Sequence, residues 1–240
     1  VFQSQSTNKI EIWFTDVLNI VGGTAIRAVP DAGWQVVGVG DFNHDANTDL
    51  VFQNQTTGKV ALWYLMGTTY AGGELISTQP VAGYKVVGVG DFNGDGKPDL
   101  LYQQQGTGQL VIWFMNGATR TGGVSIPQQA PVGYRVVGVG DLDGDGKQDL
   151  VFQNQTTNQV IVWLMNGSLF AGQRTVSTLP QAGWQVHAVT DLNGDGKADL
   201  VFQNQSTGKL VTWFMDTATM TGGDQIPLVP FADYKLMGPH

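Results

Sequence analysis

The sequence predicts an all-β protein, a five-bladed β-propeller built from four-stranded blades of 50 residues each. The chain repeats itself with a period of 50 residues and no insertions. Each repeat contains short apolar runs separated by turn residues, and no stretch combines a helical period with helix caps. A propeller suits such a chain because radial repetition leaves only short sheet edges. We expect a single domain over residues 1–240.

The repeat is visible at several phases of the chain. A run such as "VFQNQ" opens all five repeats, which start near residues 1, 51, 101, 151 and 201. A tryptophan recurs at a second phase, at Trp13, Trp63, Trp113, Trp163 and Trp213. An aromatic residue recurs at a third phase, at Trp34, Tyr84, Tyr134, Trp184 and Tyr234. A fixed period of this length is typical of solenoids, propellers and arrays.

Four strands are predicted in each repeat. They are a valine-rich run such as "YKVVGVGD", a short run such as "DLVFQNQ", an aromatic and aliphatic run such as "KVALWYLM", and a shorter run such as "GGELIS". Segments such as "NQTTGK", "MGTTYAGG" and "TQPVAGY" supply the turns between them. Glycines inside the valine-rich strand, such as Gly38 and Gly88, predict that these strands approach one another closely at the ring axis.

The two ends of the chain predict how the ring closes. Residues 1–5 match the second strand of the other blades, and residues 234–240 match the first strand, at 84–90. We therefore expect the C-terminal strand to pair with the N-terminal one and to complete that blade without a covalent link. The break in the ring then falls where a fifth acidic turn would lie.

Charge is distributed unevenly. The turns that follow the valine-rich strand are "DFNHDANTDL", "DFNGDGKPDL", "DLDGDGKQDL" and "DLNGDGKADL". They hold 13 of the 20 acidic residues, which leaves 7 acidic residues against 12 Lys and Arg elsewhere. The negative net charge of −8 therefore comes from these turns, and its explanation should lie in what the turns do.

The spacing of the acidic residues predicts calcium sites. In the pattern D-x-N-x-D-G-x-x-D, the side chains at positions one, three and five converge when the backbone curls. Glycine permits the sharp turn, the seventh carbonyl points inward, and the ninth carboxylate completes a cage of hard oxygen ligands. Metal-free Asx-turns are the alternative, although they leave several carboxylates repelling one another. The expected ligands are Asp41, Asn43, Asp45, Asp49, Asp91, Asn93, Asp95, Lys97, Asp99, Asp141, Asp143, Asp145, Lys147, Asp149, Asp191, Asn193, Asp195, Lys197 and Asp199.

About four Ca²⁺ ions are expected, and the turns should differ in affinity. The Asp41 turn should be the weakest, because Ala46 replaces the sixth-position glycine and His44 replaces the fourth-position one. The Asp141 turn should be the tightest, because Asp143 replaces asparagine and adds a charge.

The stretch "VVGVGDFNGDGKPDLL" resembles the FG-GAP and VCBS repeats, which build the integrin α-subunit propeller and many secreted bacterial propellers. This resemblance extends over all five repeats. It implies β-propeller blades with Ca²⁺ in the turn between the first and second strands. Integrin propellers have seven blades, whereas this chain has material for five.

Two sets of aromatic residues are candidates for ligand binding. Trp13, Trp63, Trp113, Trp163 and Trp213 lie beside glutamines such as Gln53 and Gln55, so clefts between blades could offer sugars an aromatic face and amide partners. The alternative, which we favour, is that these residues fill and hydrogen-bond the blade interfaces. The set that includes Trp34 and Trp184 offers the same choice between a ring of stacking platforms and core packing.

No motif for catalysis is present, so we do not expect an enzyme. An acidic pI near 4.6 disfavours nucleic acid, and no run of 18 apolar residues predicts a membrane span. We expect a monomeric, Ca²⁺-stabilised extracellular module for binding or adhesion, with a glycan or a protein as ligand. A multivalent lectin with sites between blades is the first alternative, and a non-catalytic accessory domain of a larger secreted enzyme is the second.

Overall fold

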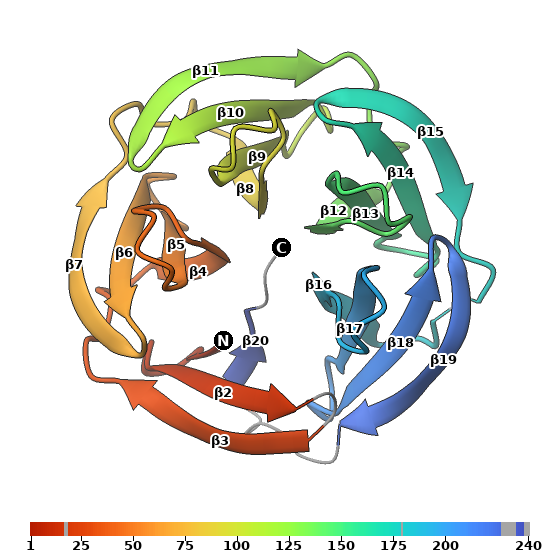
Figure 1. Cartoon of the computed structure of the whole chain (residues 1–240), viewed down its shortest axis with the longest axis horizontal. Helices are drawn as coiled ribbons and strands as arrows, with labels where there is room; N and C mark the ends of the chain where they lie inside the picture. Colours follow the sequence, from red (N-terminus) through yellow and green to blue (C-terminus); the bar gives the residue numbers. More distant parts are fainter. Residues whose placement is uncertain (17–18, 179, 227–233, 238–240) are drawn as a thin grey trace.

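The strands form a ring of five blades, and each blade is a four-stranded antiparallel sheet (Figure 1). This computed structural model describes residues 1–16, 19–178, 180–226 and 234–237. No helix occurs in those ranges, and hence none there that could span a membrane. The prediction of an all-β, five-bladed propeller is confirmed.

Blade B shows the pattern common to all blades. From the axis outward it consists of β4 (Trp34–Gly40), β5 (Asp49–Asn54), β6 (Val60–Met66) and β7 (Thr69–Leu75). In the same inner-to-outer order, blade C consists of β8 (Tyr84–Gly90), β9 (Asp99–Gln104), β10 (Leu110–Asn116) and β11 (Thr119–Ile126), and blade D of β12 (Tyr134–Gly140), β13 (Asp149–Asn154), β14 (Val160–Asn166) and β15 (Leu169–Thr175). Blade E consists of β16 (Trp184–Thr190), β17 (Asp199–Asn204), β18 (Leu210–Asp216) and β19 (Thr219–Ile226). Blade A consists of the C-terminal strand β20 (Tyr234–Leu236) followed by β1 (Phe2–Ser4), β2 (Ile10–Asp16) and β3 (Asn19–Ile26).

The hydrophobic core lies between blades because the second strand of each blade is buried on both faces. In β5, Leu50 and Phe52 belong to a cluster that includes Ile10 of blade A. Val51, on the opposite face of β5, belongs to a cluster that includes Val86 of blade C. Three consecutive apolar residues in this strand therefore hold one blade against both of its neighbours.

The inner strands touch one another around the axis, as the glycines predicted. A Cβ atom at Gly38 of blade B would collide with Cγ2 of Val89 in blade C. The same relation joins Gly88 to Val139 of blade D, and Gly138 to Val189 of blade E. Each valine thus fills the space left by a glycine in the preceding blade, and only glycine leaves that space.

The C-terminal strand completes blade A, as predicted. Strand β20 pairs with β1 in antiparallel register, with Phe2 opposite Leu236 and Ser4 opposite Tyr234. The N–H of Met237 also donates to the carbonyl of Val1. Residues 238–240 of the predicted strand lie outside the described residues.

The outermost strand is longer than the sequence predicts. In blade B it begins at Thr69 rather than at the pair of glycines, so much of the segment "MGTTYAGG" is strand and not turn. The register between β6 and β7 shifts at a β-bulge: Tyr64 lies opposite Gly72 and Leu65 lies opposite Tyr70, so one residue of β7 between them has no partner in β6. The glycines therefore lie inside the strand.

Candidate metal turns and inter-blade pockets

The four acidic turns share one backbone conformation and lie on one face of the ring, around its axis (Figure 1). In the second turn, Gly94 and Gly96 both have positive φ, at 76° and 80°. The Asp91 carboxylate accepts hydrogen bonds from the N–H groups of both glycines, and the side-chain oxygen of Asn93 accepts one from Asp95. These bonds curl the backbone and hold the oxygens of positions one and three in place.

The aspartate at position nine of each turn is buried, and its carboxylate accepts hydrogen bonds from two neighbouring segments. One carboxylate oxygen of Asp99 accepts the N–H of Phe92 at 3.1 Å, and the other accepts the N–H of Met115 in β10 at 2.9 Å. Asp49, Asp149 and Asp199 make the equivalent pairs of bonds. This residue fixes the end of the turn to the blade, a role that the sequence pattern did not reveal.

Burial makes the charged form of these aspartates unfavourable. Desolvation raises the pKa of Asp99 and of Asp149 to about 6, although the two backbone N–H donors oppose the shift. Desolvation likewise raises the pKa of Asp49 and of Asp199. A cation next to such a carboxylate would stabilise its charged form, which is the effect expected of a bound metal ion.

The third turn tests whether the donors fit a cation. Oxygens of Asp141, Asp143 and Asp149 all lie within 4.8 Å of one another. Three carboxylate oxygens in so small a volume are hard ligands of the kind that Ca²⁺ prefers, with further oxygens available from Asp145 and the Lys147 carbonyl. The residues present therefore fit a calcium ion, and the position-nine carboxylate stays close to positions one and three.

The first turn keeps the same shape at a cost. His44 and Ala46 have φ of 60° and 65°, a conformation that residues with a Cβ rarely adopt. The backbone N–H of Asn47 donates to the Asp45 carboxylate at 2.8 Å and its side-chain amide donates at 3.0 Å, and these two hydrogen bonds lower the pKa of Asp45. At position seven, this turn therefore has an asparagine whose side-chain amide donates to a carboxylate of the same turn, whereas the other three turns have lysine there.

The glutamines predicted as ligand-binding residues are used to join blades. Gln53 is fully buried; its amide N–H donates to the carbonyl of Tyr84, and its oxygen accepts the N–H of Val86 in blade C. Gln3 and Gln153 make both bonds to the next blade, and Gln203 closes the ring to Tyr234 and Leu236 of blade A. Gln55 lies next to Lys85 at the end of β8 remote from the turns. The structure does not bring these amides to the tryptophans.

The five tryptophans of the second phase differ in their surroundings. Trp163 is 2% exposed, contacts Phe152 and Phe170, and donates to Gln173, whereas Arg120 lies 4.4 Å above the ring of Trp113. Trp13 packs on Phe2. The two remaining residues, Trp63 and Trp213, are only partly buried and line pockets.

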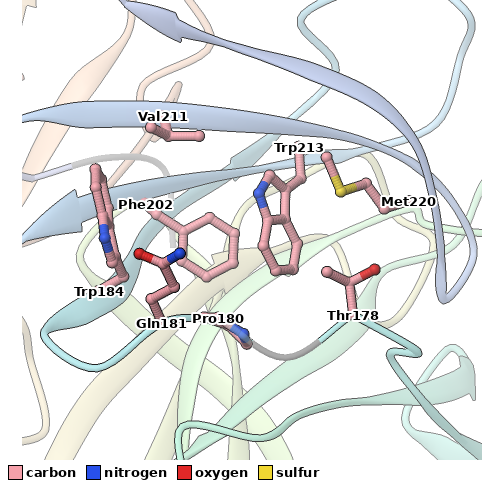
Figure 2. A pocket seen from close by; sticks show the side chains of 8 residues that line it. All are labelled: Thr178, Pro180, Gln181, Trp184, Phe202, Val211, Trp213 and Met220. Atoms are coloured by element: carbon pink, nitrogen blue, oxygen red, sulfur yellow. The ribbon is translucent and has the colours of Figure 1, made fainter.

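The pocket at Trp213 lies between blades D and E and has a volume of about 340 Å³. Figure 2 shows Trp184 and Trp213 on either side of Phe202, with Thr178 and Gln181 facing them from the segment that joins the blades. The rings of Phe202 and Trp213 pack at a tilt of 50°, with their centroids 4.5 Å apart. The wall of this pocket is therefore aromatic and its opposite side is polar.

A second pocket occupies the equivalent place between blades A and B, with a volume of about 260 Å³. Trp34, Phe52 and Trp63 take the places of the three aromatic residues in blade E, and the polar residues are Asp31 and Glu74. Both pockets occur in the blades whose inner strand begins with tryptophan, at Trp34 in blade B and Trp184 in blade E, whereas the inner strands of blades A, C and D begin with tyrosine. That coincidence was a signal available in the sequence.

Replacing Trp163 and Trp213 by alanine in turn should separate core from pocket residues. We expect Trp163→Ala to cost about 3–5 kcal/mol, because it empties a site between packed aromatic rings. We expect Trp213→Ala to cost less than about 2 kcal/mol, because one side of the ring already faces a pocket. Urea unfolding measures both, and equal losses would contradict the distinction.

Comparison with solved structures finds chains of similar fold. The chain matches a chain from a nidogen/laminin complex with a TM-score of 0.55 and 13% identity, covering 99% of this chain and 95% of that one. It also matches a protein of unknown function from Bacteroides caccae, with a TM-score of 0.49, 12% identity, and coverage of 92% and 70%. No curated protein sequence matches the chain. The nidogen/laminin match supports the fold alone.

Family assignment comes from the sequence of the blades. The model of the FG-GAP-like repeat matches three overlapping segments, at residues 41–102, 91–152 and 141–202. Each match contains two acidic turns and the strands between them. Together the matches cover more than half of the chain, and the chain therefore belongs to the FG-GAP-like repeat proteins.

Proposed function

We propose that this chain is a Ca²⁺-stabilised propeller that serves as a non-catalytic binding module outside the cell. The observation that carries the proposal is that oxygens of Asp141, Asp143 and Asp149 lie within 4.8 Å of one another, in a type of turn that occurs four times in the chain. Four Ca²⁺ ions would balance the formal net charge of −8. Turn sites of this kind suit an environment rich in Ca²⁺, which favours an extracellular location.

The proposed role of Ca²⁺ is structural. Each turn joins the first and second strands of a blade, and its ninth aspartate anchors the turn to the third strand. A cation held by positions one, three, five and nine, with the seventh carbonyl, would fix these strands relative to one another. The binding surfaces would then be the inter-blade pockets, which no residue of the acidic turns lines, so the turns would serve stability alone.

Calcium stoichiometry tests the proposal directly. By isothermal titration calorimetry we expect three tight sites, at the Asp91, Asp141 and Asp191 turns, with the Asp141 turn the tightest, and a weaker fourth at the Asp41 turn. The substitution Asp141→Ala should remove one of the three tight sites, because it deletes the first ligand of that turn. Ala46→Gly should strengthen the fourth site, because glycine adopts the required φ without strain.

Asp224→Asn is the matched control, since Asp224 is an exposed acidic residue outside the turns. It should leave the number of sites unchanged. A protein that binds no Ca²⁺, or whose binding is equally reduced by Asp224→Asn, would refute the proposed metal sites.

A further inference from the structure

We propose that the pockets at the A–B and D–E boundaries each bind one pyranose ring of a neutral glycan. This inference rests on the proposed function as a binding module and names its ligand. It departs from a lectin site built on Trp63 with Gln53, because Gln53 is buried and engaged with blade C.

The aromatic wall suits a sugar ring. In blade E, the tilted rings of Phe202 and Trp213 and the indole of Trp184 line a concave surface (Figure 2). In blade B, Phe52, Trp63 and Trp34 repeat the arrangement, with Phe52 and Trp63 centroids 4.7 Å apart. A pyranose presents an apolar C–H face that packs on indole and keeps its hydroxyls at the ring edge. The same aromatic triad in two separate blades indicates one common class of ligand.

The polar groups opposite the wall suit hydroxyls. Gln181 and Thr178 offer donors and acceptors in the D–E pocket, and Asp31 offers acceptors in the A–B pocket. Glu74 also lines the A–B pocket, but it lies opposite Leu62 in the sheet and its carboxylate accepts the hydroxyl of Tyr64 at 2.7 Å, on the other face of the blade from Trp63. The Asp31 carboxylate would repel an anionic sugar, so the ligand common to both pockets is neutral.

The volumes and the number of the pockets restrict the class of ligand further. The volume of about 340 Å³ lies at the small end of ligand pockets, which begin at about 300 Å³, and the volume of about 260 Å³ lies just below it. Both pockets therefore suit a single ring rather than a long chain. Two separate pockets on one rigid ring favour branched or repeating glycans, because linked sites raise the effective concentration of the second sugar.

Blade C shows how such a pocket can be closed. At the position of Met220 in blade E and Tyr70 in blade B, blade C has Arg120, whose guanidinium covers Trp113 at 4.4 Å. An aromatic residue at this position does not by itself close the pocket, because Tyr70 lies 4.8 Å from Trp63 in blade B, as Phe170 lies 5.0 Å from Trp163 in blade D. An arginine at this position is therefore compatible with the blade and occupies the face that a sugar would use.

The test uses the full chain and a panel of methyl glycosides. The probes are the pyranosides of D-glucose, D-galactose, D-mannose, L-fucose and N-acetyl-D-glucosamine, with methyl glucuronide as the anionic comparison. Saturation-transfer NMR identifies binders, and calorimetry counts sites. We expect at least one neutral glycoside to bind at two sites per chain, and the glucuronide to bind at least tenfold more weakly.

Variants taken from blade C locate the sites. Met220→Arg should reduce the count to one, and Met220→Arg with Tyr70→Arg should reduce affinity at both sites at least tenfold. Leu169→Arg is the control, because it adds the same charge at an exposed position that lines neither pocket. Thermal melts of each variant check that the fold is intact.

Three outcomes would overturn the inference: no neutral glycoside binds, the double arginine variant binds as well as the parent, or Leu169→Arg abolishes binding to the same extent. The calcium experiment fails or succeeds separately. Sugar binding by a protein that does not respond to Ca²⁺ would refute the metal sites only, and Ca²⁺ binding without sugar binding would refute the pockets only.

Discussion

Removing Ca²⁺ with a chelator is expected to lower the melting temperature of the propeller by roughly 15–30 °C. Each tight site should stabilise the fold by about 2.7 kcal/mol when free Ca²⁺ is 100 times Kd, so three sites contribute about 8 kcal/mol. For a chain of this size, 1 kcal/mol shifts the melting temperature by about 2–4 °C. Calorimetric melts in Ca²⁺ and in chelator measure the shift.

The physical reason is the density of charge in the turns. Without a cation, three or four carboxylates face one another at short range, and Asp99 and Asp149 remain charged at pH 7 although burial disfavours that form. Mg²⁺ at the same concentration is the control, because its smaller size and strict octahedral geometry suit these turns less well. A melting temperature that is the same in Ca²⁺ and in chelator would contradict a stabilising role for the metal.

Deleting residues 234–240 is expected to destabilise the ring by at least about 5 kcal/mol and to cause aggregation or domain-swapped oligomers. The deletion removes β20 and with it the buried side chain of Leu236, which contributes about 2 kcal/mol. It also removes the Tyr234 carbonyl that accepts from Gln203 and the Leu236 N–H that donates to Gln203. Several backbone hydrogen bonds to β1, of about 1 kcal/mol each, are lost as well. Light scattering after size exclusion detects the oligomers.

The exposed edge of β1 is the reason to expect association. An unpaired strand edge next to apolar side chains is a template for pairing with another chain. Lys235→Ala serves as the control, because Lys235 is exposed and its backbone pairing with Gln3 is unaffected by the side chain. A truncated chain that stays monomeric with an unchanged melt would show that β20 does not hold the ring closed.

The fold could be predicted because the repeat shows the same information five times. The phases of tryptophan, glycine and acidic residues located the strands and turns even where a single copy would be ambiguous. The start of the outer strand was missed because a β-bulge beside Tyr64 places glycines inside a strand, where they look like a turn.

The site was only partly predictable, because its contacts join residues that are far apart in the sequence. The hydrogen bond from the Gln53 amide to the carbonyl of Tyr84 joins residues 31 positions apart, and it forms only because blades B and C pack side by side. Trp34 and Trp63 were assigned to separate candidate sites, whereas both line the same pocket. Acidic turns are local, and their ligand pattern could be recognised without knowing the tertiary structure.

The glycines and valines around the axis give the ring a direction. Gly88 of blade C receives Val139 of blade D, and blade C in turn presents Val89 to Gly38 of blade B. Blade D likewise presents Val139 to blade C and receives Val189 of blade E at Gly138. Each of these blades therefore offers one kind of surface to its predecessor and a different kind to its successor, which is the head-to-tail contact found in cyclic oligomers. The propeller is equivalent to a cyclic pentamer whose subunits share one chain. Its blade number is set by the rotation between neighbours, and a run of fewer blades would have two complementary surfaces with which to assemble with copies of itself.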